Sequence, residues 1–186
     1  MTVWTEHLAH LGATLGDASL HFSDPASEAR TATETTIAVP LLHLGTIRSV
    51  GPDSAAFLHN LVSNEVKELE ADADEWNSFN SPKGRMIASF LMWPEAEGHA
   101  LVLSADILPA FLKKFSMYVL RSKVKLSNVS ADVALIGISG PNATAVVHAT
   151  GAELPGADMK QTLAASGLRC IRLGATRYLL AVPVDA

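Results

Sequence analysis

The segment Ser81-Pro82-Lys83-Gly84-Arg85 holds the residues best suited to binding an anion. Lys83 and Arg85 supply an ammonium and a guanidinium group, and the amides of a tight turn can point at the same carboxylate. The alternative is a solvated turn without a ligand, because Pro and Gly are typical of turns in any protein.

Trp76 precedes this segment and could offer its indole face to a planar ring. Packing in a hydrophobic core is the alternative role for a tryptophan at the start of a predicted strand. The two alternatives differ in one measurable quantity, the solvent exposure of the indole.

Other chemical groups give weaker signals. His7 and His10 are three residues apart, but no third ligand is near them in the sequence, so we predict no metal site. Cys170 lies between Arg169 and Arg172, which would favour a thiolate if the sulfur were exposed; a buried strand residue is the alternative. The chain lacks the nucleophile elbow, the Walker loop and the dinucleotide-binding fingerprint. Nucleotide binding of those types and hydrolysis by a catalytic triad are therefore not expected.

A β-hairpin over Trp76 to Phe90 is expected to position Lys83 and Arg85, with Pro second and Gly fourth in a type I turn. Ala100 to Leu103 predicts the next strand. Ser104 stands where an N-cap belongs, before a helix whose inner face has the spacing of an apolar stripe.

The remaining segments give a mixture of helices and strands. Val3 to Leu15 predicts a helix, whereas Ser23 to Thr35 has hardly any large apolar residue and predicts a mobile loop. Ile37 to Val50 predicts two strands or one bent strand, and Val133 to Ile138 predicts a buried strand. A hairpin is expected near the end of the chain, with strands at Leu168–Leu173 and Tyr178–Val182.

One internal similarity suggests a duplication. Gly51-Pro52-Asp53 and Gly140-Pro141-Asn142 each follow a strand-like run and precede a helix, and each Asp or Asn could cap that helix. Two related halves packed on one mixed sheet would explain the pattern. The alternative is a common way of starting a helix that happens to be used twice.

Composition limits the possible functions. The 186 residues, with 48% apolar and 18% charged side chains, are enough for one compact domain or two small modules. The net charge of -5 argues against a protein that neutralises many phosphates over a broad surface. A single cysteine and no visible signal peptide or membrane span lead us to expect a cytoplasmic protein.

Several motifs, in order, resemble the folate-binding domain of the aminomethyltransferase (glycine cleavage T-protein) superfamily. They are Leu42–Leu58, Leu61–Val66, Phe79–Ile87, Leu101–Ser104 and Gly137–Ala143. The ordered set covers about residues 37 to 150 and looks closest to the YgfZ-like branch. The Lys-Gly-Cys segment followed by Gly-Gln-Glu of that branch is absent, and members of the family are longer, so we expect this chain to be a shortened form.

The resemblance implies a binding role for this chain. In the T-protein enzymes the hairpin after the glycine pair bears an aspartate central to aminomethyl transfer, and that place falls at Ala88, followed by Ser89. Neither a methyl nor a hydroxyl group can do the electrostatic or proton-transfer work of a carboxylate. True aminomethyltransferase activity is therefore not expected.

By similarity, Leu44, Trp76 and Ser104 are expected to line a cavity for tetrahydrofolate or a derivative. Lys83 and Arg85 are added on physical grounds as contacts for its anionic end. The YgfZ-like branch also implies a role in the assembly or repair of iron-sulfur enzymes, including those that modify tRNA. Iron-sulfur proteins are then possible partners, with no direct nucleic-acid contact and no membrane expected. The alternatives are aminomethyl transfer through another residue, or an interaction domain that binds no folate.

The expected fold is α+β, a mixed, largely antiparallel sheet with packed helices and two pseudo-repeated halves. Residues 1–36 are predicted to form the N-terminal helix and mobile loop, and residues 37–186 the folate-binding T-protein-like domain, without the C-terminal barrel domain of the family.

Overall fold

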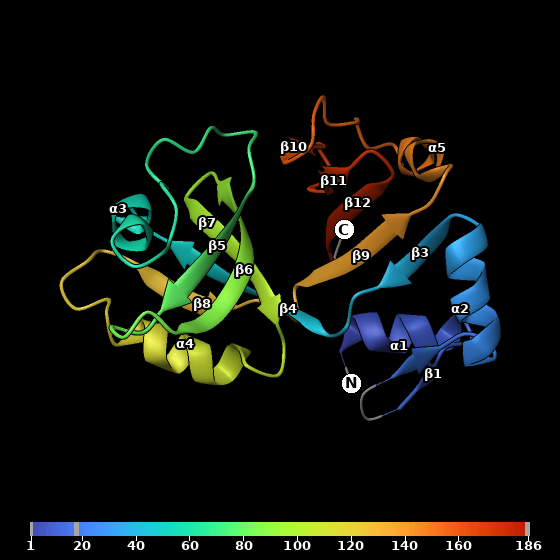
Figure 1. Ribbon diagram of the computed structural model, residues 1–186, viewed down its shortest axis with the longest axis horizontal. Helices are drawn as coiled ribbons and strands as arrows, with labels where there is room; N and C mark the ends of the chain where they lie inside the picture. The colour runs from blue at the N-terminus through green and yellow to red at the C-terminus, as the bar shows by residue number, and fades with distance from the viewer. Residues whose placement is uncertain (1, 17–18, 185–186) are drawn as a thin grey trace. The chain divides into compact units, whose positions relative to one another are not determined.

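The computed structural model describes residues 2–16 and 19–184. They fold as two compact units. In Figure 1, which is coloured by residue number, the central unit runs from cyan to yellow, and the terminal unit combines the blue start of the chain with its orange and red end. The central unit is Leu42–Ser130, and the terminal unit combines the described parts of Met1–Leu41 and Ala131–Ala186. The predicted boundary between residues 36 and 37 falls within the terminal unit.

The central unit is a five-stranded sheet with two helices. Its elements are β4 (Leu44–Val50), α3 (Ser54–His59), β5 (Glu75–Asn80), β6 (Met86–Glu95), β7 (Gly98–Ser104), α4 (Leu108–Ser116) and β8 (Lys125–Asn128). The strands lie in the order β5-β6-β7-β4-β8, and each neighbouring pair is antiparallel. The predicted hairpin and the strand at Ala100–Leu103 are thereby confirmed.

An aromatic cluster fills the space between this sheet and its helices. Leu108, Phe111 and Phe115 recur at the spacing of one helical stripe and are buried, so α4 lies with this stripe against the sheet (Figure 1). The Phe115 ring centroid lies 5.2 Å from that of Phe79 on β5 and 5.3 Å from that of Phe57 on α3. These edge-to-face contacts fix one face of the sheet as the inner face.

The terminal unit has a second five-stranded sheet, in the order β10-β11-β12-β9-β3 and again antiparallel throughout. Its elements are α1 (Val3–His10), β1 (Thr14–Leu15), β2 (Leu20–His21), α2 (Pro25–Glu34), β3 (Ile37–Pro40), β9 (Val133–Ser139), α5 (Ala143–Ala149), β10 (Lys160–Leu163), β11 (Arg169–Gly174) and β12 (Arg177–Pro183). Cys170 is a buried strand residue that packs with Ile138 and Val147.

The two units repeat one design. In the central unit β4 leads through α3 to β5, β6 and β7, and in the terminal unit β9 leads through α5 to β10, β11 and β12. Corresponding strands occupy corresponding places in the two sheets, with β8 and β3 as equivalent edge strands. This shared order excludes a helix-start motif that merely happens to occur twice, and it confirms the two pseudo-repeated halves.

The repeated Gly-Pro segments are structurally equivalent, but their caps are not as predicted. Gly51 and Gly140 have φ of +136° and +128°, a conformation that favours glycine. Neither Asp53 nor Asn142 makes a side-chain cap. Instead Asp53 Oδ2 accepts from the Lys123 amide at 2.7 Å, and the Asn142 amide donates to a threonine hydroxyl, Thr36 Oγ1, at 2.7 Å. Both helix starts are therefore tied to the segment before the edge strand.

The prediction of a mobile loop over Ser23–Thr35 is wrong, because most of it forms the helix α2. Asp24 caps this helix by accepting from the Ser27 amide at 2.9 Å, and Pro25 fits its first turn. Glu28 reaches back to accept from the amides of Phe22 and Ser23, at 2.7 and 2.8 Å. These capping hydrogen bonds thus specify α2, although its sequence has no apolar stripe that would predict a helix. The helix predicted from Val3 to Leu15 ends earlier, at His10.

The α+β class with largely antiparallel pairing is confirmed, with one difference in detail. The strands expected in one mixed sheet are divided between two five-stranded sheets, and every pair among them is antiparallel. The segment Ile37–Val50 shows the reason, since β3 pairs with β9 whereas β4 pairs with β7 and β8. No helix among the described residues is long and apolar enough to cross a bilayer.

Candidate functional site

The hairpin of β5 and β6 presents Lys83 and Arg85 at its tip. The Gly84 amide donates to the Ser81 carbonyl at 2.8 Å, which closes the predicted turn, and Gly84 has a φ of +73°. The Ser81 hydroxyl accepts from the Arg85 amide at 3.1 Å and holds the end of the turn. Both cationic residues are exposed, and neither forms an ion pair with a described residue.

Trp76 lies on the outer face of the central sheet, opposite the aromatic cluster. Along β5 the side chains of Asn77 and Phe79 are buried on the inner face, so Trp76 and Ser78 must point to the other one. The indole is 56% exposed. Core packing therefore does not explain this tryptophan, which leaves its face open to a ligand.

Leu44 and Ser104 are brought together as a cross-strand pair at the end of β4 and β7. Side chains alternate along β7, so Ser104 and Val102 share the outer face. Val102 pairs with Leu91 on β6, and Leu91 pairs with Trp76 on β5, so Trp76 lies on the same face. Trp76 and Ser104 are thus two strands and two residues apart on one face, roughly 10–12 Å. Leu44, Trp76 and Ser104 therefore lie on one sheet face, with Lys83 and Arg85 at the hairpin tip. Leu91 and Val102, which lie between Trp76 and Ser104 on this face, are buried.

The predicted helix cap at Ser104 is wrong. The N-cap residue of α4 is Ile107, and no side chain caps this helix. The Ser104 hydroxyl instead donates to the Asp106 carboxylate, and this hydrogen bond, with one from the Ile107 amide, lowers the pKa of Asp106. Ser104 thus holds a nearby carboxylate in its charged form.

Two hydroxyl groups near Trp76 were missed by sequence reasoning. Ser78 and Ser89 are directly paired across β5 and β6 and lie on the outer face. Ser89 is exposed, and Ser78 is partly so. Strand alternation relative to Phe79 and Phe90 was the available signal, since it places both serines on the face that Trp76 occupies.

A polar network fixes the edge of β5 beside Trp76. Asn64 donates its side-chain amide to the Trp76 carbonyl at 2.7 Å, and its backbone amide donates to Asn77 Oδ1 at 2.9 Å. Asn77 in turn donates to Glu75 Oε1 at 2.6 Å. Burial raises the pKa of the Glu75 carboxyl, against the lowering effect of that hydrogen bond. The network holds the strand that carries the indole.

Ala88, at the place where the T-protein enzymes have an aspartate, points into the core and not toward solvent. Ala88 is 3% exposed and belongs to the aromatic cluster with Phe79 and Phe90. Its neighbour Ser89 is the residue that faces outward. A carboxylate at position 88 would enter an apolar core, whereas one at position 89 would stand near Trp76.

Two open cavities lie elsewhere. One, of about 700 Å³, is lined by Asp53, Tyr118, Leu120, Arg121 and Ser122, and the other, of about 480 Å³, by Pro141, Asn142, Thr144, Ala145, His148 and Leu154. None of the five predicted ligand residues lines either cavity. Among residues 2–16 and 19–184, no group of three or more His, Cys, Asp or Glu side chains could hold a metal ion.

Comparison with known proteins adds the family. The model of the GCVT N-terminal domain matches residues 10–174, which is most of the chain. The chain belongs to this family. The match covers the whole central unit and the terminal unit as far as β11, and the resemblance to the aminomethyltransferase superfamily is confirmed.

Curated relatives are of two kinds. The tRNA-modifying protein YgfZ of Vibrio vulnificus is 32% identical over 108 residues, which cover 58% of this chain and 33% of that protein. YgfZ of Yersinia enterocolitica is 28% identical over 136 residues, 73% of this chain and 41% of that protein. An aminomethyltransferase of Bacillus mycoides is 27% identical over 107 residues, 57% of this chain and 29% of that protein. The chain thus spans well under half the length of these relatives.

Solved structures confirm the fold. Aminomethyltransferase T of the glycine cleavage system from Bartonella henselae superposes with a TM-score of 0.81 at 17% identity, covering 98% of this chain and 53% of that one. At this identity the likeness concerns the arrangement of strands and helices alone.

Proposed function

We propose that this GCVT-type chain binds tetrahydrofolate or a derivative at the outer face of its central sheet, as part of an accessory protein of the YgfZ kind. The observation that carries the proposal is the exposed indole of Trp76, held on a strand whose other face is a packed aromatic core. Family membership and the YgfZ relatives support the same ligand class.

The residues present fit the chemistry of a folate. A pterin is planar and aromatic, and an indole that is 56% exposed offers it a stacking surface. The hydroxyls of Ser78 and Ser89 on the same face can donate to or accept from the edge of such a ring. Leu44 and Ser104 border this face at the end of β4 and β7.

The other end of a folate carries glutamate carboxylates. Lys83 and Arg85 stand at the hairpin tip. Lys83 follows Trp76 by seven residues. Arg85 lies opposite Ser81, which follows Trp76 by five residues, or roughly 15–17 Å at 3.3 Å per strand residue. An elongated ligand with a ring at one end and anionic groups at the other matches this separation. The cations would then bind the carboxylates at the solvent-exposed end.

The biological role follows from the relatives and stays a proposal. YgfZ proteins are named as tRNA-modifying, and we infer that this chain supports iron-sulfur enzymes, including those that modify tRNA, with iron-sulfur proteins as partners. A cytoplasmic location is part of the same proposal, and a sequence with a single cysteine fits a reducing compartment.

Aminomethyl transfer is the competing function, because aminomethyltransferases are among the relatives. It would need a group to replace the absent carboxylate. Ser78 and Ser89, which lie near Trp76 on the outer face, carry hydroxyl groups instead. An assay for tetrahydrofolate-dependent release of ammonia from an aminomethylated carrier separates the two functions. Clear turnover would contradict a purely binding role.

Substitution of Trp76 tests the proposed site. We expect Trp76→Ala to weaken tetrahydrofolate binding by about 1–3 kcal/mol, because base-like rings stacked on aromatic side chains gain energy of that order. Isothermal titration calorimetry measures the change. The thermal midpoint should hardly move, since the indole is mostly exposed.

Phe22→Ala is a matched control, since this ring is also exposed but lies on the terminal unit. It should leave folate affinity unchanged. If Trp76→Ala and the parent protein bind folate equally, or if folate never raises the melting temperature, the site is wrong and the alternative of an interaction domain without folate is favoured.

A further inference from the structure

The chain segment from α4 to β8 has an unusual charge for an acidic protein. Between Asp106 and Asp132 there are five Lys or Arg residues and no Asp or Glu. The whole chain has 14 basic and 19 acidic residues, so everything outside this segment has 9 basic and 19 acidic ones. We call Lys113, Lys114, Met117, Tyr118, Leu120, Arg121 and Lys123 the basic loop.

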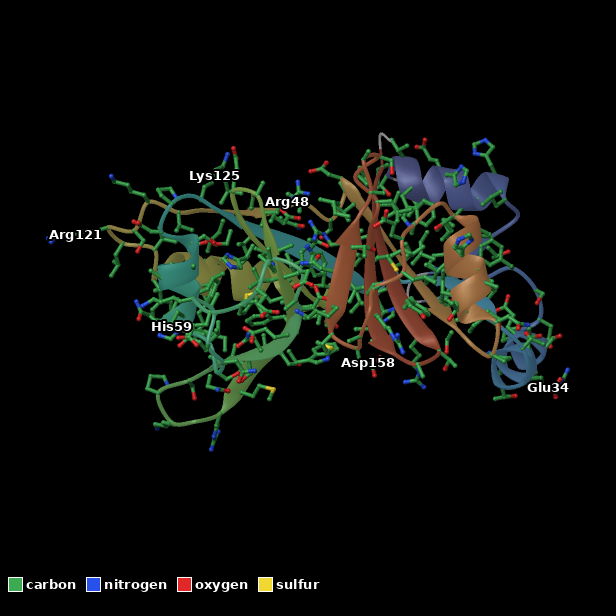
Figure 2. The ribbon with its side chains drawn as sticks, turned by 90° about the horizontal axis from the view of Figure 1, so that it is seen from above. Glu34, Arg48, His59, Arg121, Lys125 and Asp158 are labelled. Atoms are coloured by element: carbon green, nitrogen blue, oxygen red, sulfur yellow. The ribbon has the colours of Figure 1, made fainter. Side chains whose placement is uncertain are left out.

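All four cations of the basic loop face solvent. Lys113 and Lys114 lie in the last turn of α4, away from the buried stripe of Phe111 and Phe115. Arg121 lies at the outer end of the loop that follows α4, as Figure 2 shows. None of the four cations makes an ion pair within residues 2–16 and 19–184. Their charge is therefore available to a partner.

The same loop exposes apolar side chains at its tip. Leu120 is 88% exposed and Met117 is 72% exposed, whereas Tyr118 is partly covered by an edge-to-face contact with Phe79 at 5.6 Å. Two exposed aliphatic side chains of this size next to four cations form an amphipathic protrusion. Burial of such side chains would be favourable wherever an apolar phase is at hand.

Leu120 adopts a backbone conformation that does not suit it. The Ser122 amide donates to the Val119 carbonyl at 2.8 Å, so Leu120 is the second residue of a tight turn, with a φ of +44°. Gly, Asn or Asp is favoured there, because a left-handed conformation crowds a Cβ. The side chain of Leu120 is 88% exposed, so burial in the core does not offset this strain. Strain of this kind suggests a function at the residue that bears it.

The basic loop also has one acid beside it. Asp53 lines the cavity that Tyr118, Leu120 and Arg121 border, but its Oδ2 already accepts from the Lys123 amide. It ties the loop to the start of α3 instead of pairing with a loop cation. The backbone of the basic loop is therefore anchored to α3 through Lys123, while its cationic side chains face solvent.

We propose that the basic loop binds the surface of an anionic lipid bilayer, with Leu120 and Met117 inserted among the acyl chains and the four cations at the headgroups. Lys and Arg near a surface rich in anionic lipid each strengthen binding, and apolar side chains beside them add the insertion energy. The proposal is independent of folate binding, and it replaces the sequence-based expectation of no membrane partner.

Two other partner classes fit the residues less well. A single-stranded nucleic acid would use exposed aromatic rings for stacking, whereas the most exposed apolar side chains here are aliphatic. A protein partner would favour Arg and disfavour Lys at its interface, whereas three of the four cations are Lys. A lipid surface accepts both features.

Vesicle sedimentation tests the proposal with the chain as it stands. The protein should sediment with vesicles of phosphatidylcholine and phosphatidylglycerol at low salt, and not with vesicles of phosphatidylcholine alone. The double substitution Lys113→Gln/Lys114→Gln should lower the partition coefficient about 30-fold, since each cation is worth about a factor of five at such a surface. Arg30→Gln/Lys67→Gln changes net charge equally at exposed sites elsewhere and should have little effect.

Leu120→Asn separates insertion from folding. Asn suits the turn position, so the thermal midpoint should stay or rise, while the partition coefficient should fall about tenfold or more through loss of the inserted side chain. Absence of binding to anionic vesicles at low salt would overturn the proposal, as would equal binding by Leu120→Asn. Binding of bulk tRNA that Lys113→Gln/Lys114→Gln abolishes, without vesicle binding, would assign the basic loop to nucleic acid instead.

Discussion

At the scale of single residues, the neighbours Ala88 and Ser89 show how strand alternation decides which chemistry is possible. Ala88 is buried among Phe79 and Phe90, while Ser89 faces outward beside Ser78. The absence of a carboxylate at position 88 thus matches a position with no access to the outer face.

We predict opposite consequences for an added carboxylate at these two positions. Ala88→Asp should lower the free energy of unfolding by about 3–5 kcal/mol, because it places an unpaired charge in an apolar cluster. Ser89→Asp should change it by less than about 1 kcal/mol, because its site is exposed. Urea denaturation of both variants measures the difference, and equal costs would contradict the assigned faces of β6.

A buried histidine links stability to pH. Ser54 Oγ lies 3.0 Å from His99 Nδ1 and donates to the Ser49 carbonyl at 2.9 Å, so it can accept from the imidazole. Burial lowers the pKa of His99 below 6.5, against a smaller raising effect of Glu95. Because the pKa of His99 is lower in the folded than in the unfolded state, the neutral imidazole stabilises the fold at pH values above its unfolded-state pKa. This stabilisation is lost as pH falls toward its folded-state pKa.

The free energy of unfolding should therefore decrease as pH falls below 6.5, and His99→Asn should remove this part of the pH dependence. The raised pKa of Glu75 acts in the opposite sense, because stability falls as pH rises from 4.5 through the folded value. Urea titrations of the parent, His99→Asn and Glu75→Gln resolve the two effects. An unchanged slope between neutral pH and pH 5 in His99→Asn would show that another group is responsible.

At the scale of elements, the strand-turn-helix units at Gly51 and Gly140 require a glycine, whereas neither of their helices has a side-chain cap. An added Cβ would lie 2.1 Å from the Lys123 carbonyl oxygen at Gly51, and 2.5 Å from that of Thr35 at Gly140. Each glycine lets the helix start approach the segment that precedes an edge strand, β8 in one unit and β3 in the other. The two halves share this requirement as well as their strand order.

Alanine substitutions should separate a backbone clash from a simple conformational cost. Gly51→Ala and Gly140→Ala should each destabilise the protein by more than about 2 kcal/mol, because strain and a backbone clash add. Gly84→Ala should cost only about 1–2 kcal/mol, since it has a positive φ but open space around it. Thermal denaturation gives the order of the three, and a Gly84 effect as large as the others would contradict it.

At the scale of the whole molecule, each of the two units has a hydrophobic cluster of its own. The central unit depends on the aromatic cluster around Phe115, and the terminal unit on a cluster that includes Val147, Ile138 and Leu180. The central unit is continuous in sequence, whereas the terminal unit combines segments from both ends. A local loss of packing should therefore be felt first in the unit where it occurs.

Amide hydrogen exchange can test this division. Phe115→Ala should cost about 3–5 kcal/mol and accelerate exchange mainly in β4, β6 and β7. Val147→Ala should cost less, about 1–3 kcal/mol, and accelerate exchange mainly in β9 and β12. Equal acceleration in both sheets for either variant would show that the chain opens as one unit.

The sequence by itself determined the α+β class, the β5–β6 hairpin with a turn at Ser81–Gly84, and the two Gly-Pro segments. These features are local, because alternation, Pro and Gly act within a few residues and leave a readable pattern. The helix α2 was readable in principle from Asp24-Pro25 and Glu28, but capping gives a weaker signal than an apolar stripe.

Only the tertiary structure decided which strands pair and which face each side chain occupies. Ile37–Val50 reads as one strand-rich run, and its division between two sheets depends on partners far away in sequence, β9 for β3 and β7 for β4. The same long-range pairing exposes Trp76, buries Ala88 and places Ser104 opposite Leu44. Hydrogen bonds between distant strands, which no local pattern encodes, therefore place the candidate site.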